Sequence, residues 1–227
     1  MPVNTQPVTI AIDDTTRVSG LLCAPPQAKA CYVLAHGAGA GMEHKSMAAL
    51  ADGLAERAIA TLRYQFPYMD KGKRSPDTPK VAHATVREAV AEAAKRMPGV
   101  PLVAGGKSFG GRMTSQAQAI EPLAGVVGLA FLGFPLHAPG KPSDERAAHL
   151  SDVKVPMLFL QGARDDFAQL DLLQPLVKRL GKRATLRLFE DADHSFHVPA
   201  RTGRKDDEVM VELLDVLAAW ITSSASA

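Results

Sequence analysis

The 227-residue sequence has little cysteine: only Cys23 and Cys31 occur, and no C-x-x-C pair is present. Two cysteines do not make a disulfide framework, and Cys31 lies in an apolar run, which favours a buried reduced thiol. The histidines show neither H-x-x-x-H nor cysteine-rich spacing, so no metal site is predicted. We therefore expect a protein that works without a metal or another cofactor.

Strong charge and long apolar runs are also missing. The net charge of +2 is too small to indicate binding to nucleic acid or to a membrane surface. No apolar run approaches the roughly 18 residues of a membrane span, and the N-terminal residues do not resemble a signal peptide. We expect a cytoplasmic protein, and the sequence does not predict its oligomeric state.

What the chain does have is a regular alternation of apolar runs and amphipathic segments. Residues 8–12 and 18–22 alternate apolar with polar positions and predict an antiparallel edge hairpin. Apolar runs, which when continuous are typical of strands covered on both faces, occur at 30–35, 100–104, 125–134 and 155–160, and further strands are predicted at 60–66 and 184–190. Between them, helical periodicity follows Ser46, which can cap a helix, and recurs at 86–97, 109–120, 170–180 and from residue 206.

This alternation predicts an α/β fold with a mainly parallel sheet, an antiparallel N-terminal hairpin and helices on both faces. Pro67 is expected to stop the strand at 60–66, and residues 223–227 are expected to form a frayed tail. With 46% hydrophobic residues, no internal repeat and no linker-like composition, the chain is predicted to form one domain over residues 1–227.

The segment 106–110, Gly-Lys-Ser-Phe-Gly, matches G-x-S-x-G and lies between a predicted strand and a predicted helix. In that motif the serine, here Ser108, sits on a strained turn that lifts its hydroxyl above the sheet edge. The same residues do not fit a phosphate-binding loop, because that motif needs a glycine where Pro101 stands. A serine hydroxyl is a poor nucleophile alone, so this interpretation needs a base and an acid elsewhere.

The ends of later strands supply candidates for both. Asp165 follows the run at 155–160, and His194 follows the run at 184–190, which gives the chain order serine, acid, histidine of α/β-hydrolase triads. Asp166 and His197 are the weaker alternatives for the acid and the base. The backbone N–H groups of Ala38 and Phe109 are the candidate oxyanion donors. His36 is expected to fix the Gly-rich turn, and the roles of Lys107, Arg63 and Tyr64 stay open between substrate contact and structure.

Three motifs carry a family resemblance. They are Ala-His-Gly-Ala-Gly-Ala-Gly at 35–41, Leu-Arg-Tyr-Gln-Phe-Pro-Tyr at 62–68 and Gly-Gly-Lys-Ser-Phe-Gly-Gly-Arg-Met at 105–113. With them the chain, over roughly residues 8–222, resembles small, lid-poor α/β-hydrolases of the dienelactone-hydrolase-like kind. It is most similar to a branch of bacterial predicted hydrolases related to the hydrolase-like domain of the NSL-complex subunit and testis-expressed proteins. The resemblance implies Ser108 as nucleophile, Asp165 as acid and His194 as base. One departure is Asp166, where a proline is common in the family.

These observations predict a serine hydrolase that cleaves small carboxylic esters or thioesters through an acyl-enzyme. The connection at 135–154 is short, which leaves little chain for a lid and suggests an open site for short acyl groups. The rival hypothesis is a non-enzymatic interaction module that has kept the hydrolase fold, because a fold by itself does not fix a function.

Overall fold

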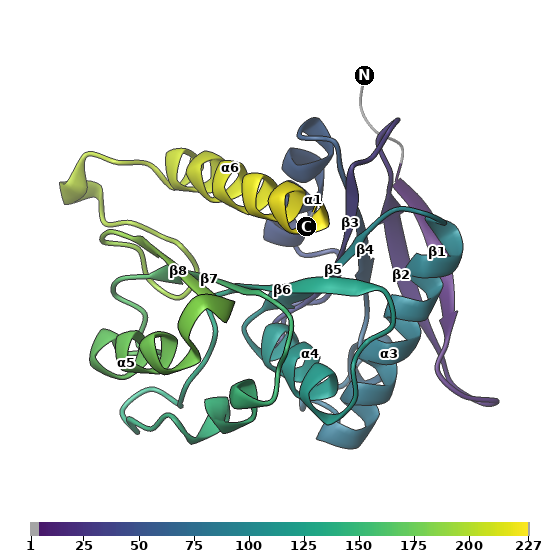
Figure 1. Ribbon diagram of the computed structural model, residues 1–227, viewed down its shortest axis with the longest axis horizontal. Helices are drawn as coiled ribbons and strands as arrows, with labels where there is room; N and C mark the ends of the chain where they lie inside the picture. The colour runs from purple at the N-terminus through teal and green to yellow at the C-terminus, as the bar shows by residue number, and fades with distance from the viewer. Residues whose placement is uncertain (1–4, 227) are drawn as a thin grey trace.

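In the computed structural model, residues 5–226 are described and form an eight-stranded sheet with helices on both faces (Figure 1). The strand order is β1-β2-β4-β3-β5-β6-β7-β8. The strands are β1 (Thr5–Ala11), β2 (Arg17–Cys23), β3 (Ala30–Ala35), β4 (Ile59–Tyr64), β5 (Leu102–Lys107), β6 (Val126–Leu132), β7 (Met157–Gly162) and β8 (Ala184–Phe189).

The strand pairing confirms the predicted sheet. β1 and β2 form an antiparallel hairpin with Ile10 opposite Val18, and β2 pairs antiparallel with β4. Every pairing from β4 across to β8 is parallel. β3, β4 and β7 are buried at all positions, as expected for strands covered on both sides, whereas the edge strand β8 alternates in exposure.

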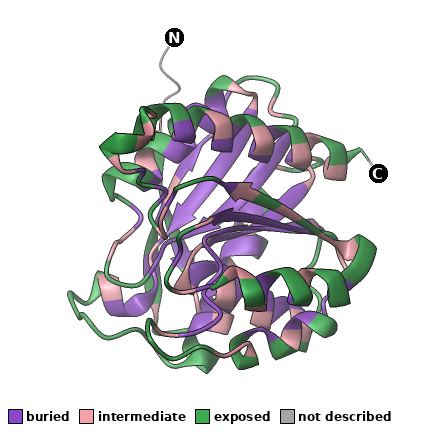
Figure 2. Ribbon diagram, turned by 90° about the vertical axis from the view of Figure 1, so that its left-hand side faces the viewer, coloured by how far each residue is buried: buried purple, intermediate pink, exposed green. Residues whose placement is uncertain are grey.

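Two helical layers bury this sheet (Figures 1 and 2). One face carries α1 (Lys45–Glu56) and α6 (Asp206–Ala225), and the other carries α3 (Pro79–Arg96), α4 (Phe109–Ile120) and α5 (Leu170–Leu180). The shorter elements are α2 (Pro67–Asp70), η1 (Glu145–Ser151), η2 (Gly181–Arg183) and η3 (Ala200–Thr202). No helix within residues 5–226 combines the length and apolar character needed to cross a membrane.

Two local predictions were wrong. α1 begins two residues earlier than a Ser46 cap would allow, because the imidazole of His44 accepts a hydrogen bond from the Ser46 N–H and caps the helix. Pro67 does not end a strand: β4 already stops at Tyr64, and Pro67 opens the short helix α2. Proline suits a first helical position because the N–H it lacks would have no partner there.

The C-terminal segment is more regular than its composition indicated. α6 continues to Ala225, so the frayed tail expected from residue 223 is helical over 223–225, and residue 227 lies outside the described residues. The start of α6 agrees with its acidic sequence, because Asp206, Asp207 and Glu208 lie at the positive end of the helix dipole. Glu208 also accepts a hydrogen bond from the Lys205 N–H, which fixes the first turn.

Candidate active site

The candidate side chains lie on loops that leave the same edge of the sheet. Because β3, β5, β7 and β8 are parallel, their carboxyl ends meet there: Ala35 is level with Gly106, and Gly162 is level with Phe189. The loops that follow these four strands contain Ala38, Ser108, Asp165 and His194. Sites of open α/β sheets form at this edge.

Ser108 occupies the strained turn between β5 and α4. Its backbone has φ 48° and ψ −115°, a conformation that costs a non-glycine residue of order 1–3 kcal/mol. The glycines around it make the turn possible. A Cβ on Gly106 would lie 2.1 Å from the Ala35 carbonyl oxygen, and a Cβ on Gly110 would lie 2.5 Å from the His36 carbonyl oxygen. Only glycine allows β5 and α4 to approach the end of β3 so closely.

The structure brings Ser108, His194 and Asp165 into one hydrogen-bonded chain. His194 Nε2 lies 2.9 Å from Ser108 Oγ, and His194 Nδ1 lies 2.7 Å from Asp165 Oδ2. Since an ionised carboxylate only accepts hydrogen bonds, Nδ1 carries the proton and Nε2 is left to accept one from the serine. The imidazole also stacks on the Phe167 ring, with centroids 4.4 Å apart, which restricts its orientation.

Asp165 is buried, and its carboxylate is surrounded by donors. Oδ1 accepts the Phe167 N–H at 2.8 Å, and Oδ2 accepts hydrogen bonds from His194 and from the buried amide of Gln161. The alternative acid, Asp166, is exposed to solvent and lies outside this network. Gln161 was missed in the sequence analysis, although an amide at the end of an otherwise apolar strand was a usable signal. Its Oε1 accepts the Phe134 N–H at 2.9 Å, so it joins β6 to the acid loop.

The loop that carries His194 is held from both sides. Asp193 Oδ1 accepts the N–H groups of Ser195 and His197 and so caps the loop. Lys107 Nζ donates to the His194 carbonyl oxygen and lies 5.4 Å from the centroid of the Phe196 ring. His197, the alternative base, is exposed and pairs with Asp206 at 2.8 Å, which raises the pKa of the imidazole.

His36 fixes the Gly-rich turn after β3, as expected. Its Nδ1–H donates to the Gly37 carbonyl oxygen at 2.8 Å, and its Nε2 accepts the Phe66 N–H at 3.1 Å. Burial lowers the pKa of this imidazole, so the neutral form that this pattern requires is favoured. A Cβ on Gly37 would lie 3.8 Å from the Ser108 Cβ, so the turn is adjacent to the serine.

The candidate oxyanion donors lie on either side of Ser108 in the fold. Ala38 belongs to the turn fixed by His36, and Phe109 is the first residue of α4. Within residues 5–226, neither backbone N–H donates to a protein acceptor. The first N–H groups of a helix have no intrahelical partner and attract negative charge.

Arg63 and Tyr64 lie beneath the site. Both side chains are buried, and the Arg63 guanidinium donates to the Met42 carbonyl oxygen at 3.1 Å. Arg63 therefore supports the loop between β3 and α1. This contact of Arg63 and the burial of both side chains favour the structural alternative for the two residues.

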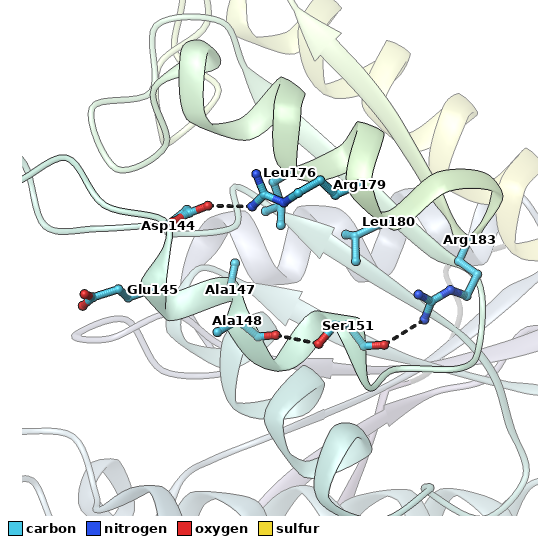
Figure 3. Close-up of a pocket in the computed structure, with 9 residues that line it drawn as sticks. All are labelled: Asp144, Glu145, Ala147, Ala148, Ser151, Leu176, Arg179, Leu180 and Arg183. Carbon is cyan, nitrogen blue, oxygen red and sulfur yellow. Dashed lines mark hydrogen bonds and ion pairs between the residues drawn. The ribbon is translucent and has the colours of Figure 1, made fainter.

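The surface has two hollows, of which only the second borders the candidate site. The one in Figure 3 is bounded by η1 and α5, and the ion pair between Arg179 and Asp144, 2.6 Å long, crosses it. Arg183 reaches the Ser151 carbonyl oxygen across its other end (Figure 3). None of the predicted site residues lines it. The second hollow borders the acid loop and is lined by Ala163, Arg164, Asp165, Asp166, Gln169, Leu170, Asp193, His197 and Pro199.

The strand order, the turn at Ser108 and the loops at the sheet edge are those of an α/β hydrolase. A family model described as an alpha/beta hydrolase domain matches residues 28–222, and the chain belongs to this family.

Solved structures with the same fold include small hydrolases. A dienelactone hydrolase from Anabaena variabilis is 17% identical with a TM-score of 0.78, and 97% of each chain is covered. A serine hydrolase without a lid from Xanthomonas campestris is 20% identical, with a TM-score of 0.73 and 97% of each chain covered. An esterase domain from Rhodothermus marinus is 15% identical, with a TM-score of 0.74 and 97% of this chain and 98% of that chain covered. The predicted resemblance to dienelactone-hydrolase-like proteins is confirmed at the level of the fold.

Proposed function

We propose that the protein is a serine hydrolase that cleaves small carboxylic esters or thioesters through a covalent acyl-enzyme. Ser108 is the nucleophile, His194 the general base and acid, and Asp165 the residue that orients the imidazole. The N–H groups of Ala38 and Phe109 bind the oxyanion. No metal or organic cofactor has a part in these steps.

In the acylation half, Ser108 Oγ attacks the carbonyl carbon of the substrate while its proton passes to His194 Nε2. The imidazolium that forms is stabilised by the Asp165 carboxylate. The carbonyl oxygen becomes an oxyanion between the two N–H donors, each of which contributes a factor of about 10²–10³ in rate in well-studied cases. The carbon–oxygen or carbon–sulfur bond then breaks, and His194 returns its proton to the departing alcohol or thiol.

In the deacylation half, water takes the place of the leaving group. His194 removes a proton from this water, whose oxygen attacks the acyl carbon and forms a second oxyanion in the same position. The bond to Ser108 Oγ breaks, the proton returns to the serine, and the carboxylic acid leaves. The enzyme has then regained its starting protonation state.

One observation carries the proposal: a serine in a strained turn lies 2.9 Å from an imidazole whose other nitrogen lies 2.7 Å from a buried carboxylate. A general base has to be within hydrogen-bond reach of the proton that it takes, and this arrangement meets that requirement. Membership of the hydrolase family and the fold shared with an esterase domain and a lid-less serine hydrolase support the reaction class.

Labelling with a fluorophosphonate probe tests the proposal, because such probes react with an activated serine. We expect the parent protein to be labelled, Ser108→Ala to show no label, and Asp166→Asn, a neighbouring carboxylate outside the network, to be labelled like the parent. An unlabelled parent protein, correctly folded by circular dichroism, would instead support the rival hypothesis of a non-enzymatic interaction module.

A further inference from the structure

Arg112 lies one helical turn beyond the proposed nucleophile. Its backbone N–H donates to the Ser108 carbonyl oxygen at 3.1 Å, the first such bond of α4. Side chains of an α-helix lean toward its N-terminus, so the Arg112 side chain covers the turn that begins at Ser108. The residue is half-buried, and its position places a cation at the border of the candidate active site.

Among the described residues, 5–226, the guanidinium of Arg112 has no hydrogen-bond or ion-pair partner. Its Nε is buried without a hydrogen-bond acceptor, and within residues 5–226 no carboxylate forms an ion pair with it. Six other arginines have a carboxylate within 4 Å, namely Arg57, Arg87, Arg96, Arg179, Arg187 and Arg204. The buried Arg63 has none and also has an unpartnered Nε, but its guanidinium donates to the Met42 carbonyl oxygen. A partly buried cation without a counter-charge is costly unless something else compensates it.

The groups around Arg112 increase this positive character. Arg146 on η1 adds to burial in lowering the pKa of the Arg112 guanidinium. His149, also on η1, has its pKa lowered to about 4 by burial first and then by Arg112 and His83, whereas Asp152 acts weakly in the opposite direction. His149 Nε2 lies 2.8 Å from Ser115 Oγ, so the imidazole is held against α4. Arg112 on α4, His83 on α3 and Arg146 and His149 on η1 thus influence one another's charge, and Asp152 is the carboxylate that acts against them.

We propose that Arg112, assisted by Arg146, binds an acidic group of the substrate, so that the enzyme acts on esters or thioesters that carry a second, anionic function. A planar guanidinium binds carboxylate or phosphate with two parallel hydrogen bonds, which suits either group. The proposal rests on the hydrolase function proposed above and specifies its substrate class.

Two 4-nitrophenyl esters of equal acyl length test the subsite: the pentanoate, which is neutral, and the monoester of glutaric acid, which ends in a carboxylate. For the parent protein we expect a higher kcat/KM on the glutarate ester. In Arg112→Gln the ratio of the two kcat/KM values should fall by about 10- to 100-fold, the usual effect of losing a charge-assisted hydrogen bond. Arg112→Lys should retain part of the preference for the glutarate ester, because lysine keeps the charge but lacks the two parallel N–H donors of a guanidinium.

Arg57→Gln is the matched control, because Arg57 is paired with Asp215 on the opposite face of the sheet. This substitution should leave the ratio of the two kcat/KM values unchanged. Arg146→Gln removes an exposed side chain, so a smaller fall in the ratio there cannot come from misfolding. Inhibition of pentanoate hydrolysis by succinate or by inorganic phosphate, weakened in Arg112→Gln, would show which anion the subsite prefers.

The outcomes separate this inference from the function on which it rests. Turnover of both esters with the same ratio in the parent and in Arg112→Gln, without inhibition by either anion, would overturn the anion subsite alone. Failure of the parent to hydrolyse either ester, together with no fluorophosphonate labelling, would overturn both.

Discussion

The ammonium group of Lys107 donates a hydrogen bond to the backbone carbonyl oxygen of His194. The residue before the proposed nucleophile therefore holds the loop that carries the proposed base. Burial lowers the pKa of this ammonium to about 8, while Asp165 and Asp193 act in the opposite direction. A half-buried cation held in this way ties β5 to the loop after β8, so it sets the distance between Ser108 and His194.

Replacing Lys107 with methionine removes this donor and keeps much of the side-chain volume. Hydrogen bonds to charged groups contribute about 1.5–3 kcal/mol, so we expect kcat on 4-nitrophenyl butyrate to fall by about 10- to 100-fold. KM should change little, because the lost contact positions the base and is not made to the substrate. Lys141→Met, in an exposed loop, is the control. An unchanged kcat in Lys107→Met would show that the loop needs no such support.

The glycine at 110 is predicted to be irreplaceable for a steric reason. A Cβ at this position would lie 2.5 Å from the His36 carbonyl oxygen and 2.6 Å from the Ala35 Cβ, both of which belong to a buried strand end that cannot move aside. Forcing such a contact typically costs about 1–3 kcal/mol or more. We expect Gly110→Ala to lower the free energy of unfolding in urea by at least this amount and to reduce fluorophosphonate labelling.

Gly53→Ala is the matched comparison, since Gly53 is also a buried helical glycine. Its added Cβ would meet Leu214 Cδ1 at 2.3 Å, but that atom is the end of a flexible side chain and can rotate away. The substitution should therefore be much less destabilising than Gly110→Ala and should leave labelling intact. Equal losses of stability in the two variants would contradict the steric explanation.

Much of the fold could be predicted because its signals are local. The buried runs of β3 and β7 and the alternation of β1 report directly on what covers each strand. The order of Ser108, Asp165 and His194, which follow β5, β7 and β8, indicated the candidate site, since parallel strands bring their carboxyl ends together.

The remainder depends on contacts between segments that are distant in sequence. Gln161 supports Asp165 and Phe134 at once, and Lys107 reaches the His194 carbonyl 87 positions away. Such contacts leave no periodic pattern in the amino-acid sequence, so they could not be predicted from it. The cap of α1 was missed for a different reason: His44 is an unusual capping residue, and Ser46 fits the common preference better.

The acyl-chain preference follows from the connection after β6. Leu136 and His137 donate backbone hydrogen bonds to the Phe167 carbonyl oxygen at 2.8 and 3.1 Å, which ties this segment to the acid loop. Further along the connection, η1 packs on α4. Little chain is left to cover a long acyl group, so added methylenes gain none of the roughly 0.8 kcal/mol each that burial would provide.

We expect kcat/KM to be higher for 4-nitrophenyl acetate and butyrate than for the palmitate ester by at least about 10-fold. The measurement requires a common detergent concentration for all three esters, so that solubility does not set the order. A preference for the palmitoyl ester would contradict the open site and would require a cover that residues 5–226 do not supply.

The pH dependence of stability should report on His149. With its pKa lowered to about 4 in the folded protein, against an ordinary 6.5, this imidazole is neutral in the native state where the unfolded chain already binds a proton. The neutral His149 therefore costs the folded protein nothing above pH 6.5, and the free energy of unfolding decreases as the pH falls toward 4. Burial is the main cause of this lowered pKa, followed by Arg112 on α4 and His83 on α3, whereas Asp152 acts in the opposite direction.

His149→Gln removes the titration and can keep a hydrogen bond to Ser115. Between pH 6.5 and 4.5, the free energy of unfolding should fall less steeply in this variant, by up to about 1.4 kcal/mol per pH unit, the slope of one proton.

His197→Gln should act with the opposite sign. Pairing with Asp206 raises the pKa of His197, so the stability that this pair contributes is present at low pH and is lost as the pH rises. Urea unfolding at several pH values measures both slopes, and parallel curves for the parent and His149→Gln would show that the histidine is not held neutral among cations. The same curves recorded with succinate present connect stability to the anion subsite, since an anion on Arg112 would raise the pKa of His149 and flatten the slope of the parent.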